Sequence, residues 1–262
     1  DATHALALEL GVVGLMNVQY AVHQQQVYVI EVNPRASRTV PFVSKVIGVP
    51  LAKLAAKLMA GKTLKELGFT KEVVPKHVGV KESVVPFVKF AGVDTILGPE
   101  MRSTGEAMGI ADSFAAAFSK AMLSAGMRLP DKGTAFISVR DEDKAQAVQL
   151  GKRLAQCGFR VVATQGTAGV LAAHGVPSER VYKVTDAERP NIVDLIREGQ
   201  IHMVINTTSD AQAIRDSYSL RRQTVLSGVP YFTTIAAAHA VVDAIEANIS
   251  HRQVKSLQEY TA

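Results

Sequence analysis

The chain has 262 residues, 47% of them hydrophobic and 20% charged, which allows one large domain or two small ones with their own cores. Its net charge of +5 is spread over the chain, tryptophan is absent, and no apolar run approaches the roughly 20 residues of a membrane span, so we expect neither nucleic-acid nor membrane binding. The single cysteine, Cys157, excludes an internal disulfide and a cysteine-built metal site, and we expect cytoplasmic residence.

The first part of the chain, up to about residue 60, predicts a β-hairpin between two helices. Pro34 ends the second strand, because its nitrogen cannot donate a hydrogen bond to a neighbouring strand. Gly61 suits the end of the second helix. The predicted elements are a helix over residues 3–10, strands over 14–22 and 27–32, and a helix over 51–60.

Glu31 and Asn33, at the end of this hairpin, lie on one face of their strand, because residues two apart in a strand point the same way. If residues 24–26 form a three-residue hairpin loop, residues whose numbers sum to 50 face each other. That register sets Gln19 opposite Glu31, and a slip of one residue would turn Gln19 to the other face.

Arg35 and Arg38 follow this strand at once. Oxygen ligands for a hard cation, close to guanidinium groups for phosphate oxygens, suit a magnesium–nucleotide site. The alternative is a surface strand on which Glu31 only forms an ion pair with Arg35 or Arg38. Spacing alone leaves the two alternatives level.

Residues 61–128 are less regular and predict a mixed connector between two domains. Glycines bound a polar loop within it, and an Ala-rich amphipathic helix follows that loop. The predicted elements are strands over residues 78–80 and 84–90, a loop over 97–105, and a helix over 113–125.

From about residue 129 strand and helix patterns alternate regularly. Continuous apolar strands between helices predict a doubly wound parallel sheet that is covered on both faces. The predicted strands span residues 134–139, 160–164, 180–184, 201–206 and 230–233, and the predicted helices span 143–156, 168–174, 191–198, 211–226 and 235–247.

Small polar residues collect where these strands end, at Ser138, 164–167 and 206–209. The carboxyl ends of parallel strands form one edge of the sheet, where hydroxyl groups and helix amides bind phosphates. Lys144 and Lys183 would add positive charge. Helix capping explains any one of these loops equally well, and three loops at one edge raise the phosphate site to even odds.

Residues 14–60 closely resemble the end of the second ATP-grasp domain of carbamoyl phosphate synthetase large subunits. The resemblance rests on Asn17-Val-Gln19, on Glu31-Val-Asn-Pro-Arg35 and on the run that begins at Thr39. It implies an α/β chain made of the C-terminal piece of an ATP-grasp domain, a mixed connector, and a doubly wound, methylglyoxal-synthase-like domain. The implied boundaries are 1–60, 61–128 and 129–262.

The same resemblance implies site residues in the first part. Gln19, Glu31 and Asn33 would bind Mg²⁺ or Mn²⁺ together with ATP, Gln19 and Glu31 also contacting the nucleotide. Arg35 and Arg38 would serve as catalytic residues in the phosphate and carbamate chemistry.

The family makes carbamoyl phosphate from bicarbonate, ammonia released from glutamine, and two ATP, for pyrimidine and arginine synthesis. The resemblance therefore implies an ATP-dependent ligase that works with a glutaminase small subunit and the rest of the large subunit. The family's adenine pocket and glycine-rich phosphate loop have no counterpart in this chain, so we expect a C-terminal fragment that is inactive alone.

The segment from about residue 129 resembles the regulatory domain of that family, which binds the effectors UMP and IMP. Ala211 and Gln212 stand where bacterial relatives often carry a basic pair, and Phe232 stands where an acidic residue is common. The implied effector residues are Ser138, Lys144, Thr164, Thr167, Lys183, Asn206 and Thr208, and an ornithine site is implied at Glu82, Tyr231 and Thr233.

Two other functions compete with this one. A lyase resembling methylglyoxal synthase needs a carboxylate base beside the phosphate. The strand ends offer hydroxyl groups and Asn206 and no carboxylate until Asp210, which disfavours a lyase. A phosphate- or nucleotide-binding regulatory module without catalysis is the remaining alternative.

Overall fold

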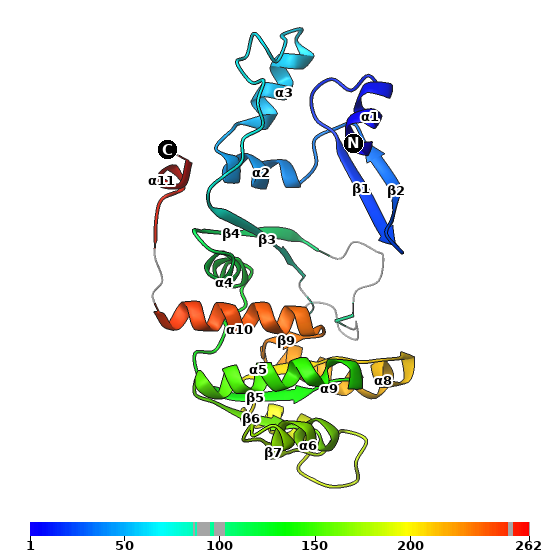
Figure 1. Cartoon of the computed structure of the whole chain (residues 1–262), viewed down its shortest axis with the longest axis vertical. Coiled ribbons are helices and arrows are strands. Elements are labelled where there is room, and N and C mark those ends of the chain that lie inside the picture. The colour runs from blue at the N-terminus through cyan, green and yellow to red at the C-terminus, as the bar shows by residue number, and fades with distance from the viewer. Residues whose placement is uncertain (86, 88–94, 97–102, 251–253, 262) are drawn as a thin grey trace. The chain divides into compact units, whose positions relative to one another are not determined.

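The computed structural model describes residues 1–85, 87, 95–96, 103–250 and 254–261 (Figure 1). Its contacts divide the chain into two compact units. The first unit is Asp1–His77 with Val254–Ala262, and the second unit is Val78–Gln253. Most of the predicted connector therefore packs with the C-terminal part of the chain, and the three-domain division stays a prediction.

The hairpin of the first unit follows a short helix, α1 (Ala2–Glu9), and consists of β1 (Asn17–His23) and β2 (Gln26–Asn33). The predicted three-residue loop is wrong: only Gln24 and Gln25 connect the strands, both with positive φ, at 47° and 66°. Two such residues form the tight turn that matches the twist of paired strands.

A bulge in the hairpin restores the predicted register. The pairing shifts between Gln19 and Tyr20, so that the extra residue on β2 compensates for the shorter loop. Gln19 consequently faces Glu31, and Asn17 faces Asn33, as the sequence predicts.

Two further helices, α2 (Thr39–Ile47) and α3 (Leu51–Met59), complete the first unit with the terminal α11 (Leu257–Thr261). The helix α2 is not among the predicted elements; it contains Pro41, which is tolerated because it lies in the first turn. Gly48, with φ of 68°, ends α2.

None of the helices in the described ranges is long and apolar enough to cross a membrane by itself. On length and composition alone, the bent pair formed by α2 and α3 passes the same test, with an angle of 110° between the two helices.

The second unit begins with an antiparallel pair, β3 (Val78–Val84) and β4 (Gly105–Ala111), against which α4 (Phe114–Ser124) packs. One continuous strand replaces the predicted strand pieces at 78–80 and 84, and the rest of the prediction over 84–90 falls mainly outside the described residues, as does most of the predicted loop over 97–105. The strand β4 is not among the predicted elements, because its glycines are poor strand formers.

A sheet of five parallel strands forms the centre of the second unit, in the order β7-β6-β5-β8-β9. The predicted strand over 180–184 is shortened, so that Lys183 lies in the loop after β7. The strands are β5 (Gly133–Ser138), β6 (Phe159–Ala163), β7 (Glu179–Arg180), β8 (Met203–Asn206) and β9 (Tyr231–Phe232).

Helices cover both faces of this sheet, which confirms the doubly wound prediction. Along β5, Ala135 and Ile137 belong to one buried cluster and Phe136 to the other. The first cluster includes side chains of α5 (Lys144–Gln156), α6 (Gln165–Ala173) and α10 (Ile235–Ser250), and the second includes side chains of α7 (Ile192–Arg197) and α9 (Tyr218–Leu226).

Candidate functional site

The carboxylate of Glu31 is the centre of the candidate metal site in the first unit. The side-chain amides of Gln19 and Asn33 each donate a hydrogen bond of 2.8 Å to the same oxygen, Oε1 of Glu31. The bulged register of the hairpin brings the three side chains together. Their shared face is therefore confirmed, and their role in metal binding stays a prediction.

The side chains of Glu31, Gln19 and Asn33 could supply part of the coordination of a divalent cation, and further ligands would have to come from elsewhere. A carboxylate and two amides, which can turn their oxygens toward a cation, are hard oxygen ligands. Mg²⁺ prefers six ligands at octahedral positions, more than these side chains supply. Within the described ranges, no group of three or more His, Cys, Asp or Glu residues could hold a metal. Nucleotide phosphates would have to complete the coordination.

The predicted catalytic arginines lie in the segment after β2. Arg35 is exposed and donates from Nη1 to the carbonyl oxygen of Ala36 at 3.1 Å. Arg38, also exposed, is the residue immediately before α2. Oε1 of Glu31 accepts from two amides, so its contacts go beyond the alternative of an ion pair with Arg35 or Arg38 alone.

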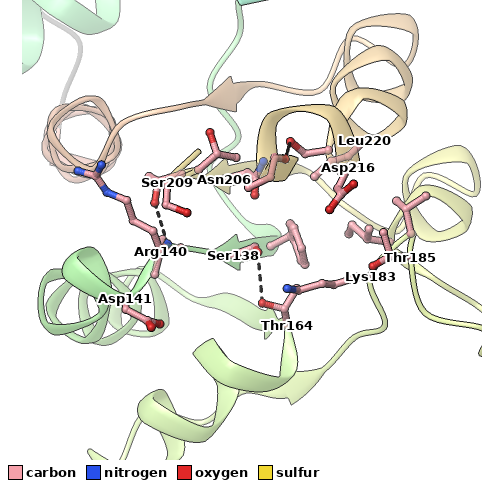
Figure 2. Close-up of a pocket in the computed structure, with 18 of the residues that line it drawn as sticks. Ser138, Arg140, Asp141, Thr164, Lys183, Thr185, Asn206, Ser209, Asp216 and Leu220 are labelled. Atoms are coloured by element: carbon pink, nitrogen blue, oxygen red, sulfur yellow. Dashed lines mark hydrogen bonds between the residues drawn. The ribbon is translucent and has the colours of Figure 1, made fainter. Parts of the chain in front are cut away.

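A cavity of about 380 Å³ opens at the carboxyl edge of the five-stranded sheet in the second unit (Figure 2). Its wall combines hydroxyl, amide and charged groups with apolar side chains. The lining residues are Phe136, Ser138, Val139, Arg140, Asp141, Glu142, Thr164, Lys183, Val184, Thr185, Ile192, Asn206, Thr207, Thr208, Ser209, Ala213, Asp216, Ser217 and Leu220.

Most of the predicted effector residues line this cavity, namely Ser138, Thr164, Lys183, Asn206 and Thr208. The hydroxyl of Thr164 donates to that of Ser138 at 3.2 Å, which joins the ends of β6 and β5. The amide of Asn206 donates to the hydroxyl of Tyr231 at 2.9 Å. The ends of neighbouring parallel strands are therefore fixed to one another around the opening.

Lys144 and Thr167 lie beside the cavity rather than on its wall. The Thr167 side chain is 2% exposed, and its hydroxyl accepts a hydrogen bond of 3.3 Å from the backbone of Val139. Nζ of Lys144 lies 2.6 Å from Oδ1 of Asp141, and this cation lowers the pKa of the Asp141 carboxyl. The hydroxyl of Thr167 therefore contacts the backbone of this domain, and the ammonium group of Lys144 is already paired with Asp141.

The loop between β5 and α5 contributes cavity residues that are not among the predicted ones. Arg140, Asp141 and Glu142 line the cavity, and the Nε of Arg140 lies 2.9 Å from the buried carboxylate of Asp143. These residues follow Ser138 directly, so the rule that found the other strand ends would also have found them.

A helix break supplies the opposite wall of the cavity. The predicted helix over 211–226 is two helices, α8 (Ala211–Asp216) and α9, with Ser217 between them. The hydroxyl of Ser217 donates to the carbonyl of Ala213 at 2.8 Å and accepts from the buried guanidinium of Arg221 at 2.7 Å. The break places Asp216 and Ser217 on the wall of the cavity.

Carboxylates are more abundant at the cavity than the sequence analysis expected. The prediction that no carboxylate lies at the strand ends before Asp210 is wrong, because Asp141 and Glu142 line the cavity together with Asp216. Figure 2 shows Asp216 and Lys183 reaching into the cavity from different elements. Because these carboxylates lie beside Arg140 and Lys183, the wall of the cavity carries no excess of positive side chains.

Glu82, the predicted ornithine residue on β3, is a half-buried carboxylate. Burial raises the pKa of its carboxyl, and the described residues contain no ion-pair partner for it. A cationic ligand beside Glu82 would offset this cost of burial. Of the other predicted ornithine residues, Tyr231 begins β9 and Thr233 directly follows it. The ornithine site stays a prediction.

Replacing Glu82 by Gln should stabilise the chain at neutral pH. A carboxyl whose pKa is raised above its ordinary value of 4.5 costs stability when ionised, and the cost disappears as the pH falls through the folded and then the unfolded pKa. We therefore expect Glu82→Gln to raise the free energy of unfolding at pH 7, with a gain that shrinks toward about pH 4. Urea unfolding at both values measures this.

The matched control is Glu106→Gln in the neighbouring strand. Glu106 forms an ion pair of 3.2 Å with Lys81, so its replacement should lower the free energy of unfolding by up to about 1 kcal/mol. A destabilising effect of Glu82→Gln at pH 7 would show that Glu82 has a stabilising partner instead of a cost of burial.

Comparisons with known proteins match both ends of the chain. Residues 1–67 match the family described as "Carbamoyl-phosphate synthase L chain, ATP binding domain", and residues 146–233 match the family described as "MGS-like domain". The chain is 56% identical over 261 residues to the carbamoyl phosphate synthase large chain of Myxococcus xanthus, 56% over 257 residues to that of Pseudomonas putida, and 53% over 262 residues to that of Archaeoglobus fulgidus. These alignments cover 98–99% of this chain and 24% of each relative, so the chain spans about a quarter of the length of the relatives.

Proposed function

We propose that this chain is a piece of a carbamoyl phosphate synthase large chain and that it contributes one wall of an ATP site and a nucleotide-effector pocket to the complete enzyme. That enzyme is an ATP-dependent ligase, which makes carbamoyl phosphate from bicarbonate, ammonia drawn from glutamine, and two ATP, for pyrimidine and arginine synthesis. The match of residues 1–67 to an ATP-binding domain favours this function over a purely regulatory module.

In the ATP site, Glu31 with Gln19 and Asn33 would hold Mg²⁺ or Mn²⁺ shared with the nucleotide phosphates. A cation bound there neutralises the charge that develops on the transferring phosphoryl group. The two amides hold the Glu31 carboxylate in one orientation through hydrogen bonds of 2.8 Å. Arg35 and Arg38 would stabilise phosphate oxygens, as their place after the strand suggests.

The rest of the large chain is the partner that we propose for the hairpin. On β2, Val27 is 57%, Val29 49% and Ile30 63% exposed, so that apolar side chains on both faces of this strand contact water. Exposed apolar surface of this kind marks a contact site. The relatives are about four times longer than this chain, and the remainder of the ATP-binding domain would cover the strand. The glutaminase small subunit is a further proposed partner, and cytoplasmic residence stays a prediction.

The effector pocket is the cavity at the sheet edge, and the observation that carries this proposal is its set of converging donors. Hydroxyl groups of Ser138, Thr164 and Thr208 line it together with Lys183. α6 begins at Gln165, so the backbone amides of its first turn lie next to Thr164 and favour an anion. The volume of about 380 Å³ lies in the range of small-molecule sites. A nucleoside monophosphate such as UMP or IMP fits this chemistry.

Lys183→Met should weaken the binding of UMP to the 262-residue chain by about tenfold or more, because a charge-assisted contact to phosphate contributes roughly 1.5–3 kcal/mol. Nζ of Lys183 has no ion-pair partner in the described part of the chain, so its removal leaves no buried charge behind. Isothermal titration calorimetry measures the dissociation constant.

The control is Lys152→Met on the exposed side of α5, which removes the same charge away from the cavity wall. Its UMP affinity should equal that of the unchanged chain. Equal losses in both variants would show that Lys183 acts only through the net charge, and the proposed pocket would then be misplaced.

A further inference from the structure

The charges of the loop between β5 and α5 are paired with one another. Arg140 lies 2.9 Å from the carboxylate of Asp143 and 3.6 Å from that of Glu142. Lys144 lies 2.6 Å from the carboxylate of Asp141. Each cation that this loop brings to the effector cavity therefore already has an anionic partner within the same loop.

The ion pair of Asp141 and Lys144 joins the cavity wall to the first turn of α6. Asp141 lines the cavity, and its side chain is 89% exposed, whereas that of Lys144 is 25% exposed. Nζ of Lys144 lies 3.5 Å from the position that a Cβ on Gly166 would take, in the first turn of α6. The cation therefore lies beside the amides that favour an anion, and Asp141 holds it there.

We propose that Asp141 limits the anion affinity of the cavity, because its carboxylate occupies Lys144 until a phosphate replaces it. This inference rests on the effector function proposed above. An incoming anionic ligand must replace Asp141 as the ion-pair partner of Lys144. It must also bind next to the released carboxylate of Asp141, which repels it. The other acidic groups of the wall, Glu142 and Asp216, do not compete in the same way, since Glu142 pairs with Arg140 and Asp216 accepts from Gln212 at 2.7 Å.

The exchange favours ligands of high negative charge. At equal distance a cation attracts a doubly charged phosphate twice as strongly as a singly charged carboxylate. A phosphate monoester therefore displaces Asp141 from Lys144, whereas a neutral nucleoside does not. The competition at Lys144 therefore lowers the affinity of the cavity for anions, and an anion of high charge overcomes it best.

The test is the binding of UMP and of inorganic phosphate to the 262-residue chain, measured by isothermal titration calorimetry. Asp141→Asn should tighten both by about three- to tenfold, because it releases Lys144 and removes a like charge. Glu142→Gln removes the same charge from the same loop but leaves Lys144 paired, and should change either affinity by about twofold at most.

Lys144→Met completes a double-mutant cycle with Asp141→Asn. In the Lys144→Met background, Asp141→Asn should give no more than the small effect of Glu142→Gln. Equal tightening by Asp141→Asn and Glu142→Gln, or tightening that persists without Lys144, would overturn the role of Asp141. The same holds if Asp141→Asn leaves UMP affinity unchanged. If neither the unchanged chain nor any variant binds UMP or phosphate, the effector function itself fails.

Discussion

Replacing Glu31 by Gln in the complete large chain is expected to lower the rate of carbamoyl phosphate synthesis by about two to four orders of magnitude. Glu31 is the only carboxylate in the set that Gln19 and Asn33 complete, and its oxygen is the point on which both amides converge. Gln keeps the shape and an oxygen acceptor, so the hairpin should remain folded. The negative charge that would hold a divalent cation is lost.

The measurement is steady-state carbamoyl phosphate production by the large chain with its small subunit over a range of Mg²⁺ concentrations. Glu72→Gln is the control, because Glu72 is an exposed carboxylate in the same unit, away from the hairpin. We expect its rate to equal that of the unchanged enzyme. A rate within about twofold of normal for Glu31→Gln would mean that this carboxylate does not hold the metal.

The second large effect concerns stability: Gly109→Ala should lower the free energy of unfolding by about 3–5 kcal/mol. A Cβ on Gly109 would lie 1.9 Å from the carbonyl oxygen of Ala117 and 2.4 Å from the backbone nitrogen of Ala121. Both atoms belong to the backbone of α4, so no side chain can turn aside. Either β4 or α4 must move, which disrupts the packing of α4 on the β3–β4 pair.

Gly105→Ala in the same strand is the matched control for Gly109→Ala. A Cβ on Gly105 would meet nothing within 4 Å, so we expect a change within about 0.5 kcal/mol. Urea unfolding followed by circular dichroism compares the two variants. Similar stability of Gly109→Ala and Gly105→Ala would show that the close approach of α4 and β4 is not maintained in solution.

The register around Glu31 was predictable from the sequence, although one step of the reasoning was wrong. The assumed three-residue loop has only two residues, Gln24 and Gln25. The bulge beside Gln19 shifts the strand pairing by one residue and so restores the predicted register. The shorter loop and the bulge thus change the register by one residue in opposite directions, and Gln19 still faces Glu31. A bulge depends on pairing between strands, which the pattern of one strand does not contain.

The part of the cavity wall that is formed by the ends of the parallel strands was predictable from the sequence. Ser138, Thr164 and Asn206 line it because a parallel sheet places its carboxyl ends at one edge. The wall formed by Asp216 and Ser217 could not be predicted in this way. It depends on the helix break, where the buried Arg221 donates to Ser217, and this is a tertiary contact without a periodic signal.

The strand β4 illustrates a further limit of sequence patterns. Its residues Gly105–Ala111 are rich in glycine and alanine, and they form a strand because they pair with β3 and accept the close approach of α4. Propensity argues against a strand there, and tertiary packing overrides it. The short helix α2 differs, because it contains Pro41, a residue that disfavours helix interiors but is tolerated in the first turn, where it lies.

The most direct measurement is a calorimetric titration of the 262-residue chain with UMP and, separately, with ATP and Mg²⁺. We expect UMP to bind at one site per chain and ATP–Mg²⁺ not to bind, because we propose that the chain holds an effector pocket and only one wall of an ATP site. Binding of ATP–Mg²⁺ without binding of UMP would contradict this division. So would production of methylglyoxal by the chain, since it would make the cavity a lyase site.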